Sequence, residues 1–183
     1  GQPIVGDPQA GVFYPLHWLW LVLTYAGIPF TQIWDEEVLG GELEKYDWLH
    51  LHHEDFTGQY GKFYANFRNA DWYRQQQARY EEMAHKLGYK KVSEEKKAVA
   101  RTIKEYVAKG GFLFAMCSAT DSFDIALAAE GVDICDTIYD GDPADPAAQS
   151  KLDYDKCLAF TDFILQMNPL VYEFSNIDTT NPA

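Results

Sequence analysis

The sequence predicts an α/β protein built on a doubly wound, mostly parallel sheet with helices on both faces. Short apolar runs alternate with longer helix-favouring stretches along the chain, which is typical of βαβ units. Glycine pairs at 40–41 and 110–111 separate helical stretches from strand-like ones, because glycine adopts a positive φ without steric cost. With 183 residues, 47% hydrophobic and 23% charged, the composition is that of a globular protein. We therefore expect one domain over residues 1–183, standing alone or within a longer chain.

The first half of the chain predicts strands around one apolar helix. This helix is expected to end at Gly27 and Pro29, and its apolar character on every side favours contact with a protein partner. Its apolar run is shorter than the about 20 residues that cross a bilayer, so we expect no membrane span. The expected elements are a strand over 2–6, the helix over 17–26, a strand over 30–34, an acidic small helix or turn from 35 to the glycine pair, and a strand over 46–52 followed by a loop.

The second half predicts helices and strands in alternation. Ser93 is a good N-cap for a long helix, because its hydroxyl can accept hydrogen bonds from first-turn amides. Val99 and Ile103 recur at helical spacing, so one face of this helix packs on the sheet. Thr120 or Asp121 is expected to cap the next helix. The expected elements are a helix within 68–88, the long helix over 93–109, a buried strand over 112–116, a helix over 121–130, a strand over 132–135, and strand-like runs over 157–165 and 170–174.

Cys117 is the first candidate for catalysis. It follows the apolar run 112–116, so it stands at the carboxyl end of a predicted strand, where a turn leads into a helix. In open α/β sheets ligands bind and nucleophiles are mounted at this edge, and a helix N-terminus there favours a thiolate. Ser118 and Asp121 come next and are candidate ligand-binding residues. A small apolar cysteine packed in a turn is the alternative interpretation.

A second candidate group lies where the third predicted strand ends. His50 and His52 stand two residues apart on that strand, so they point to one face and are candidate ligand-binding residues. His53 and Glu54 follow at the same sheet edge as Cys117. A nucleophilic thiol needs a base beside it, and a carboxylate can orient a histidine for that work. Buried, hydrogen-bonded core histidines are the alternative.

No metal or cofactor site is predicted. His50 and His52 are reasonable zinc ligands, but no distant ligand motif accompanies them. The acidic loop over 140–145 lacks the spacing and the closing glutamate of an EF-hand, so we expect a solvated turn. Tyr60 is a further candidate for binding a small molecule or a sugar. The cysteines are widely spaced, without a C-x-x-C pair, and are Cys117, Cys135 and Cys157.

The charge of the chain excludes some partners. A formal net charge of -13 at pH 7 argues against nucleic acid, which needs clustered Lys and Arg, and it disfavours an anionic membrane surface. Aromatic residues make up 15% of the chain, and exposed ones can stack on sugars or on partner proteins.

The segment 110–121, Gly-Gly-Phe-Leu-Phe-Ala-Met-Cys-Ser-Ala-Thr-Asp, resembles the strand and elbow of the class I glutamine amidotransferase-like superfamily. It is most similar to the trehalose-utilisation (ThuA-like) branch. Segments 33–39, 46–64 and 110–146 resemble a family of exported Bacteroidetes proteins that bear the label asparagine synthetase B. The resemblance implies a flavodoxin-like fold and a location in the periplasm or at the cell surface. The chain itself, starting at Gly1, has no basic region or cleavage site of a signal peptide.

Two functions follow from this resemblance and from the departures from it. The chain has neither an N-terminal cysteine nor a phosphate-binding glycine loop, so synthetase activity is not implied. No histidine follows His85, so the usual amidotransferase triad cannot form. We therefore expect a binding or accessory domain, in carbohydrate handling or a cell-envelope complex. The alternative is a thiol-dependent hydrolase with Cys117 as nucleophile, His53 as base, Glu54 as orienting or acidic group and the Ser118 amide at the oxyanion.

Overall fold

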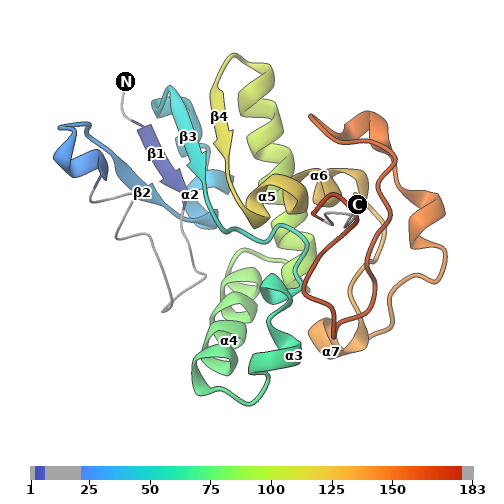
Figure 1. Cartoon of the computed structure of the whole chain (residues 1–183). Helices are drawn as coiled ribbons and strands as arrows, with labels where there is room; N and C mark the ends of the chain where they lie inside the picture. Colours follow the sequence, from blue (N-terminus) through green and yellow to red (C-terminus); the bar gives the residue numbers. More distant parts are fainter. Residues whose placement is uncertain (1–2, 7–21, 179–183) are drawn as a thin grey trace, which may run out of the picture.

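A computed structural model of the protein describes residues 3–6 and 22–178 and has a mixed α/β architecture around one small sheet (Figure 1). The strands stand in the order β2-β1-β3-β4, and every neighbouring pair is parallel. The parallel sheet predicted from the alternating pattern is therefore confirmed. The strands are β1 (Pro3–Gly6), β2 (Thr31–Ile33), β3 (Trp48–Leu51) and β4 (Phe112–Ala115).

The helices between the strands follow the predicted order. The α-helices are α2 (Asp35–Leu39), α3 (Tyr64–Phe67), α4 (Asp71–Lys86), α5 (Val92–Ala108), α6 (Ser118–Ala128) and α7 (Thr137–Asp140). The 3-10 turns are η1 (Glu42–Lys45), η2 (Tyr60–Lys62), η3 (Ala148–Lys151) and η4 (Tyr154–Lys156). Of the helix predicted over 17–26, residues 22–25 are helical, while its earlier part lies outside the described residues. Within the described ranges, every helix is too short or too polar to reach across a bilayer.

One face of the sheet packs against helices and forms the main core. Leu49 and Leu51 of β3 point to this face, and α5 brings Val99 and Ile103 against them, all nearly inaccessible to solvent. Burial of these apolar side chains is the main source of stability for the layer. The amphipathic face predicted for this helix is therefore confirmed.

The strand β4 is less buried than predicted. It is the outer strand on its side of the described sheet, next to β3 only. Leu113 and Ala115 pack against the main core, whereas Phe112 and Phe114, on the other face, are 59% and 43% exposed. The expectation of a strand buried on both faces is wrong, because an apolar run cannot distinguish one covered face from two.

Two helices begin earlier than their predicted caps. Ser93 is the second residue of α5, whose N-cap is Lys91, and it is buried against the loop before η2. The helix α6 has Cys117 as its N-cap in place of Thr120 or Asp121. In both cases the residue with good capping chemistry stands in the first turn of the helix instead of before it.

The strands predicted over 132–135, 157–165 and 170–174 are absent from the described residues. The segment after α6 is irregular apart from α7, η3, η4 and one isolated antiparallel bridge between Leu165 and Ser175. Its apolar residues, such as Phe163 and Phe174, are buried one at a time in a second cluster beside α6. Apolar residues that are buried singly in an irregular segment give a sequence pattern that resembles a strand.

Polar contacts hold this irregular segment to the domain. Asp124 is buried in α6, and its carboxylate accepts hydrogen bonds from the amides of Leu158, Ala159 and Phe160 at 2.8, 2.7 and 2.8 Å. Figure 1 shows the segment, coloured orange to red, running past α6. Charge-assisted bonds to a buried carboxylate are stronger than neutral ones, so Asp124 fixes the start of the segment.

Candidate active site

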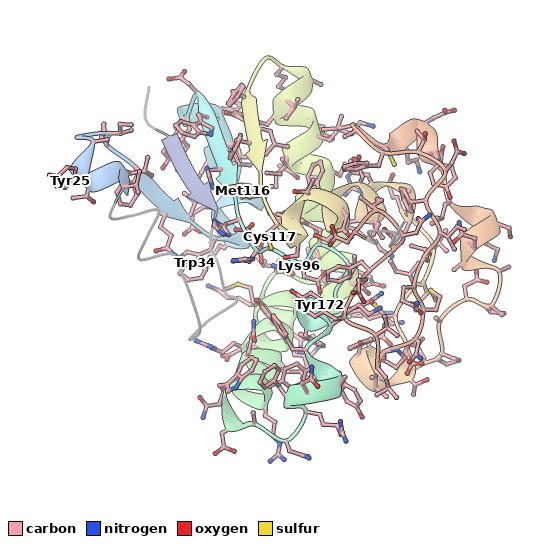
Figure 2. The ribbon with its side chains drawn as sticks, in the orientation of Figure 1. Tyr25, Trp34, Lys96, Met116, Cys117 and Tyr172 are labelled. Atoms are coloured by element: carbon pink, nitrogen blue, oxygen red, sulfur yellow. The ribbon has the colours of Figure 1, made fainter. Side chains whose placement is uncertain are left out.

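Cys117 lies between the last residues of β4 and the first turn of α6, at the carboxyl edge of the sheet (Figure 2). This predicted placement is confirmed. Its backbone has φ 53° and ψ -137°, a conformation that costs a non-glycine residue about 1–3 kcal/mol. The side chain is exposed and the thiol is free. The strand-to-helix turn therefore presents a strained, accessible cysteine.

Backbone amides surround this turn. The amides of Ala119 and Thr120 donate hydrogen bonds to the carbonyls of Met116 and Cys117 at 3.2 and 2.9 Å. The amide of Ser118 belongs to the first helical residue, whose N–H has no acceptor inside a helix. Such an N–H can donate to a negative charge that develops beside the cysteine.

Asp121 stands one helical turn after Cys117 and is fully buried. Its carboxylate has no hydrogen-bond partner outside its own helical turn. Burial, followed by the charge of Asp178, raises the pKa of Asp121 to about 7, and the amides of Ser122 and Asp121 act in the opposite direction. Burial, followed by the charges of Cys117, Asp178 and Asp121, also raises the pKa of Tyr172. Four residues after Cys117, α6 thus buries a carboxyl that tends to keep its proton.

The strand register brings the histidines to the same edge as Cys117. His50 pairs with Phe114, and the amide of Met116 donates to the carbonyl of Leu51 at 3.0 Å. The strand β3 ends at Leu51, and His53, in the loop that follows, lines a small cavity with Asp55, Tyr60 and Lys96. Among the described residues no hydrogen bond joins the side chains of His53 and Cys117, and the role of His53 as a base stays a prediction.

The histidines beside β3 favour their neutral forms. His50 is buried, and neither ring nitrogen has a hydrogen-bond partner. Burial and then the charge of His52 lower the pKa of His50 to about 4, and burial also lowers the pKa values of His52 and His53. The His52 and His53 rings lie 4.1 Å apart between centroids, while the His50 and Phe114 rings lie 5.1 Å apart. His50 is therefore a neutral ring that packs against Phe114 on one face of the sheet.

The carboxyl of Glu54 faces the interior beneath the sheet edge. Its Oε2 accepts a hydrogen bond from the His52 amide at 2.6 Å, while its Oε1 is buried without a partner. Burial raises the pKa of Glu54 to about 8, and the charges of Lys96 and Asp35 also act on it. These residues line a cavity of about 30 Å³, which holds roughly two water molecules and no small-molecule substrate.

A buried ion pair lines this cavity. The Lys96 ammonium contacts the Asp35 carboxylate and lies 5.1 Å from the centroid of the Tyr80 ring. Lys96 is 8% exposed, and sequence reasoning missed it. A signal was present, because Lys96 falls between Val92 and Val99 at helical spacing on the apolar face of α5.

Replacing Glu54 by glutamine should flatten the pH dependence of stability above about pH 6.5. The folded chain keeps the Glu54 proton up to about pH 8, whereas the unfolded chain releases it near pH 4.5. The stability that Glu54 contributes is therefore full below pH 4.5 and is lost as pH rises toward 8. Burial lowers the pKa values of the histidines, so their effect on stability, which has the opposite sign, is confined to pH values below about 6.5. Urea unfolding should show the variant gaining about 1 kcal/mol per pH unit over the wild type in this window.

Glu82→Gln is the matched control, because Glu82 is exposed on α4. Its stability profile should run parallel to that of the wild type. A Glu54→Gln profile that also runs parallel would contradict the buried, protonated carboxyl.

Tyr60 lies in an aromatic cluster away from the thiol. It is buried, its hydroxyl donates to the Tyr139 carbonyl at 3.4 Å, and its ring stacks on Tyr80 at 5.9 Å. Its backbone φ of 51° and that of Lys62, also 51°, show that η2 is a strained turn. The ligand-binding role of Tyr60 stays a prediction. In the fold, Tyr60 packs within a buried aromatic cluster.

The acidic loop forms an ion-pair cluster. The Lys91 ammonium lies 2.7 Å from Asp133, 3.1 Å from Asp140 and 2.5 Å from Asp142. Asp133, Cys135 and Asp140 place ligand atoms within 4.8 Å of one another, so they are the described residues that could hold a metal ion. The ammonium of Lys91 neutralises these carboxylates, which is the role a metal ion would have. His50 and His52 belong to no such group of three within the described residues.

Comparison with protein-family models, with curated proteins and with solved structures finds no match to this chain.

Proposed function

We propose that this chain is a flavodoxin-like domain, of the class I glutamine amidotransferase-like kind, in which the Cys117 thiol acts as a nucleophile in acyl transfer or hydrolysis. The observation that carries this proposal is the backbone of Cys117, at φ 53° and ψ -137° on an exposed strand-to-helix turn. Strain of this size persists where the surrounding structure and a function require it. The same turn lifts a nucleophile above the sheet in other α/β enzymes.

The chemistry of the turn supports the thiol as the reacting group. The N-terminus of α6 carries a partial positive charge, which would stabilise negative charge that develops in a substrate at this turn. The thiolate would attack an ester or amide carbonyl, and the carbonyl oxygen would become an oxyanion within reach of the Ser118 amide. The leaving group would depart with a proton, and water would then hydrolyse the thioester on Cys117. His53, on the neighbouring strand end, is the proposed base.

The strand order supports the fold part of the proposal. The order β2-β1-β3-β4 corresponds to the first four strands of a flavodoxin-like sheet, whose ligands bind at the carboxyl edge. Cys117 and the residues after β3 lie along this edge.

The first test is the alkylation of Cys117 by iodoacetamide at pH 7, followed by peptide mass spectrometry. Cys117 should react at least about tenfold faster in the folded chain than in the chain unfolded in urea, because an activated nucleophile reacts faster than an ordinary thiol. Cys135 and Cys157 are internal controls, because burial raises the pKa of Cys157 to about 12 and raises that of Cys135 further. Both should react more slowly when folded. Equal or slower reaction of folded Cys117 would overturn the thiol proposal.

A binding or accessory domain is the second candidate. It is favoured by the exposed aromatic face of β4, where Phe112 and Phe114 offer a contact surface, and by the absence of histidine after residue 85 in the sequence. p-Nitrophenyl acetate separates the two candidates. A burst of nitrophenol that disappears in Cys117→Ala supports thiol chemistry, and no burst with either chain supports the binding domain.

A further inference from the structure

The strand β4 leaves one of its two edges without a neighbouring strand. It is the outer strand of the described sheet on its side, and Figure 1 shows β3 as its neighbour on the other side. The amides of Phe112 and Met116 donate to carbonyls of the segment 47–51 at 3.1 and 3.0 Å, so these residues direct their backbone groups toward β3. Since this direction alternates along a strand, the N–H and C=O groups of Leu113 and Ala115 point outward.

The outward backbone groups of β4 have no hydrogen-bond partner among the described residues. They lie at the surface, because Leu113 and Ala115 are each partly exposed. Their neighbours Phe112, Phe114 and Met116 are 59%, 43% and 40% exposed. Unpaired backbone groups on an exposed strand are a template for pairing with another chain segment.

The sequence of β4 does little to prevent such pairing. Natural sheets protect their edges with charged residues, prolines, bulges or very short strands. The strand β4 is short, at four residues, but its sequence Phe-Leu-Phe-Ala has no charge and no proline. Its register with β3 runs without a bulge from the pair Trp48 and Phe112 to the pair Leu51 and Ala115. The edge is therefore open to a further strand, and its short length predicts weak, reversible binding.

We propose that the outer edge of β4 binds an extended segment of a basic partner protein, which adds a strand to the sheet. Backbone hydrogen bonds at Leu113 and Ala115 supply the affinity, as in other cases of strand addition. Phe112 and Phe114 stand on the open face of the sheet, where side chains of neighbouring strands contact one another. The partner segment is therefore apolar at alternate positions, on the face that meets these two rings.

The net charge of the chain favours a basic partner over a second copy. At pH 7 the formal net charge is -13, so two copies of the chain repel each other. A segment with Lys or Arg on both sides of its apolar positions is attracted by the same field. The occupant is thus an extended apolar stretch with basic flanks. This inference goes beyond the proposed function, because it does not depend on the reactivity of Cys117.

Fluorescence anisotropy with the whole chain and a labelled synthetic peptide tests the proposal. The peptide has the sequence Lys-Lys-Val-Thr-Val-Thr-Val-Lys-Lys, and its binding should be saturable. Two control peptides should bind at least about tenfold more weakly. The first has glutamate in place of every lysine, so the negative field of the chain repels it. The second is N-methylated on its Val and Thr residues, so it cannot donate to the outward carbonyls of β4.

Amide hydrogen exchange followed by NMR locates the bound peptide. On saturation with the lysine peptide, the amides of Leu113 and Ala115 should exchange at least about tenfold more slowly, because they gain acceptors. The amides of Phe112 and Phe114 point toward β3 and should change less. Protection that is confined to another surface of the chain would contradict the proposal.

Ala115→Pro is the sharpest variant, because proline removes the outward N–H of residue 115 and leaves the hydrogen bonds between β4 and β3 in place. It should bind the lysine peptide at least about tenfold more weakly than the wild type. Ala115→Ser keeps this N–H and is the matched control, so it should bind like the wild type. If Ala115→Pro fails to fold, the N-methylated peptide makes the same test on the wild type.

The results that overturn the proposal are no binding of the lysine peptide, equal binding of either control peptide, and equal binding by a folded Ala115→Pro. A wild-type dimer in analytical ultracentrifugation that Ala115→Pro abolishes would assign the edge to a second copy and overturn the basic partner. Slow alkylation of Cys117 would overturn the thiol chemistry and leave these binding results unaffected.

Discussion

Asp124→Ala should lower the free energy of unfolding by about 4 kcal/mol, because the amides of residues 158–160 lose a buried carboxylate acceptor. Each charge-assisted bond contributes on the order of 1.5–3 kcal/mol, and the contributions are not additive. Stabilities of single domains are about 5–15 kcal/mol, so this loss is a large share of the total. Urea unfolding followed by circular dichroism measures it.

Asp155→Ala is the matched control, since Asp155 is exposed in η4, close to the same amides in sequence. It should change stability by less than about 0.5 kcal/mol. Asp124→Asn should fall between the two, because an amide keeps one acceptor oxygen where the carboxylate had two. If Asp124→Ala were as stable as Asp155→Ala, the carboxylate would not anchor the segment.

Gly58→Ala should destabilise the fold by roughly 3–5 kcal/mol, because an added methyl group has no room and the backbone conformation disfavours it. Gly58 has φ +82°, and a Cβ there would lie 2.6 Å from the Ser93 Cα and 2.7 Å from the Ser93 nitrogen. These are backbone atoms of α5, which cannot rotate away. The loop after β3 approaches α5 this closely only because residue 58 has no side chain.

Gly88→Ala separates the steric cost from the conformational cost. Gly88 has a similar φ of +88°, but a Cβ there meets nothing within 4 Å. Its loss should be only about 1–2 kcal/mol, from the positive φ alone. Thermal and urea unfolding of both variants would show the difference. Equal losses would mean that the approach of the loop to Ser93 is looser than described.

The strands β3 and β4 and the position of Cys117 before α6 could be predicted because the residues around them carry local signals. β3 and β4 are apolar runs bounded by glycine or polar residues, and Gly110 has the positive φ that its place after α5 requires. The pairing of these strands then follows from the usual connections of parallel sheets. The irregular end of the chain gave the wrong prediction, because Phe163 and Phe174 are buried singly and no periodic pattern distinguishes such anchors from strand residues.

The site could be predicted only in part, for a related reason. Cys117 has a position in the chain that indicates its exposure at a sheet edge. Lys62 lies in η2, and its ammonium donates to the carbonyls of Gln166 and Glu173, which come 104 and 111 residues later. No property of these residues in the sequence indicates that contact. Glu54 was expected to orient His53, while its carboxylate accepts a hydrogen bond from the His52 amide and lines the same small cavity as Lys96. That arrangement depends on packing below the sheet edge.

The helix α6 carries Cys117 at its N-cap, then Asp121 and Asp124 in its next two turns. One short element therefore presents the thiol and anchors the irregular segment. A substitution that rotates or shifts this helix will disturb both at once, so the placement of Cys117 and the stability of the fold are coupled through α6. Substitutions of Phe112 and Phe114 on the exposed face of β4 leave this helix in place, so they can change the surface of the domain at less cost to its fold.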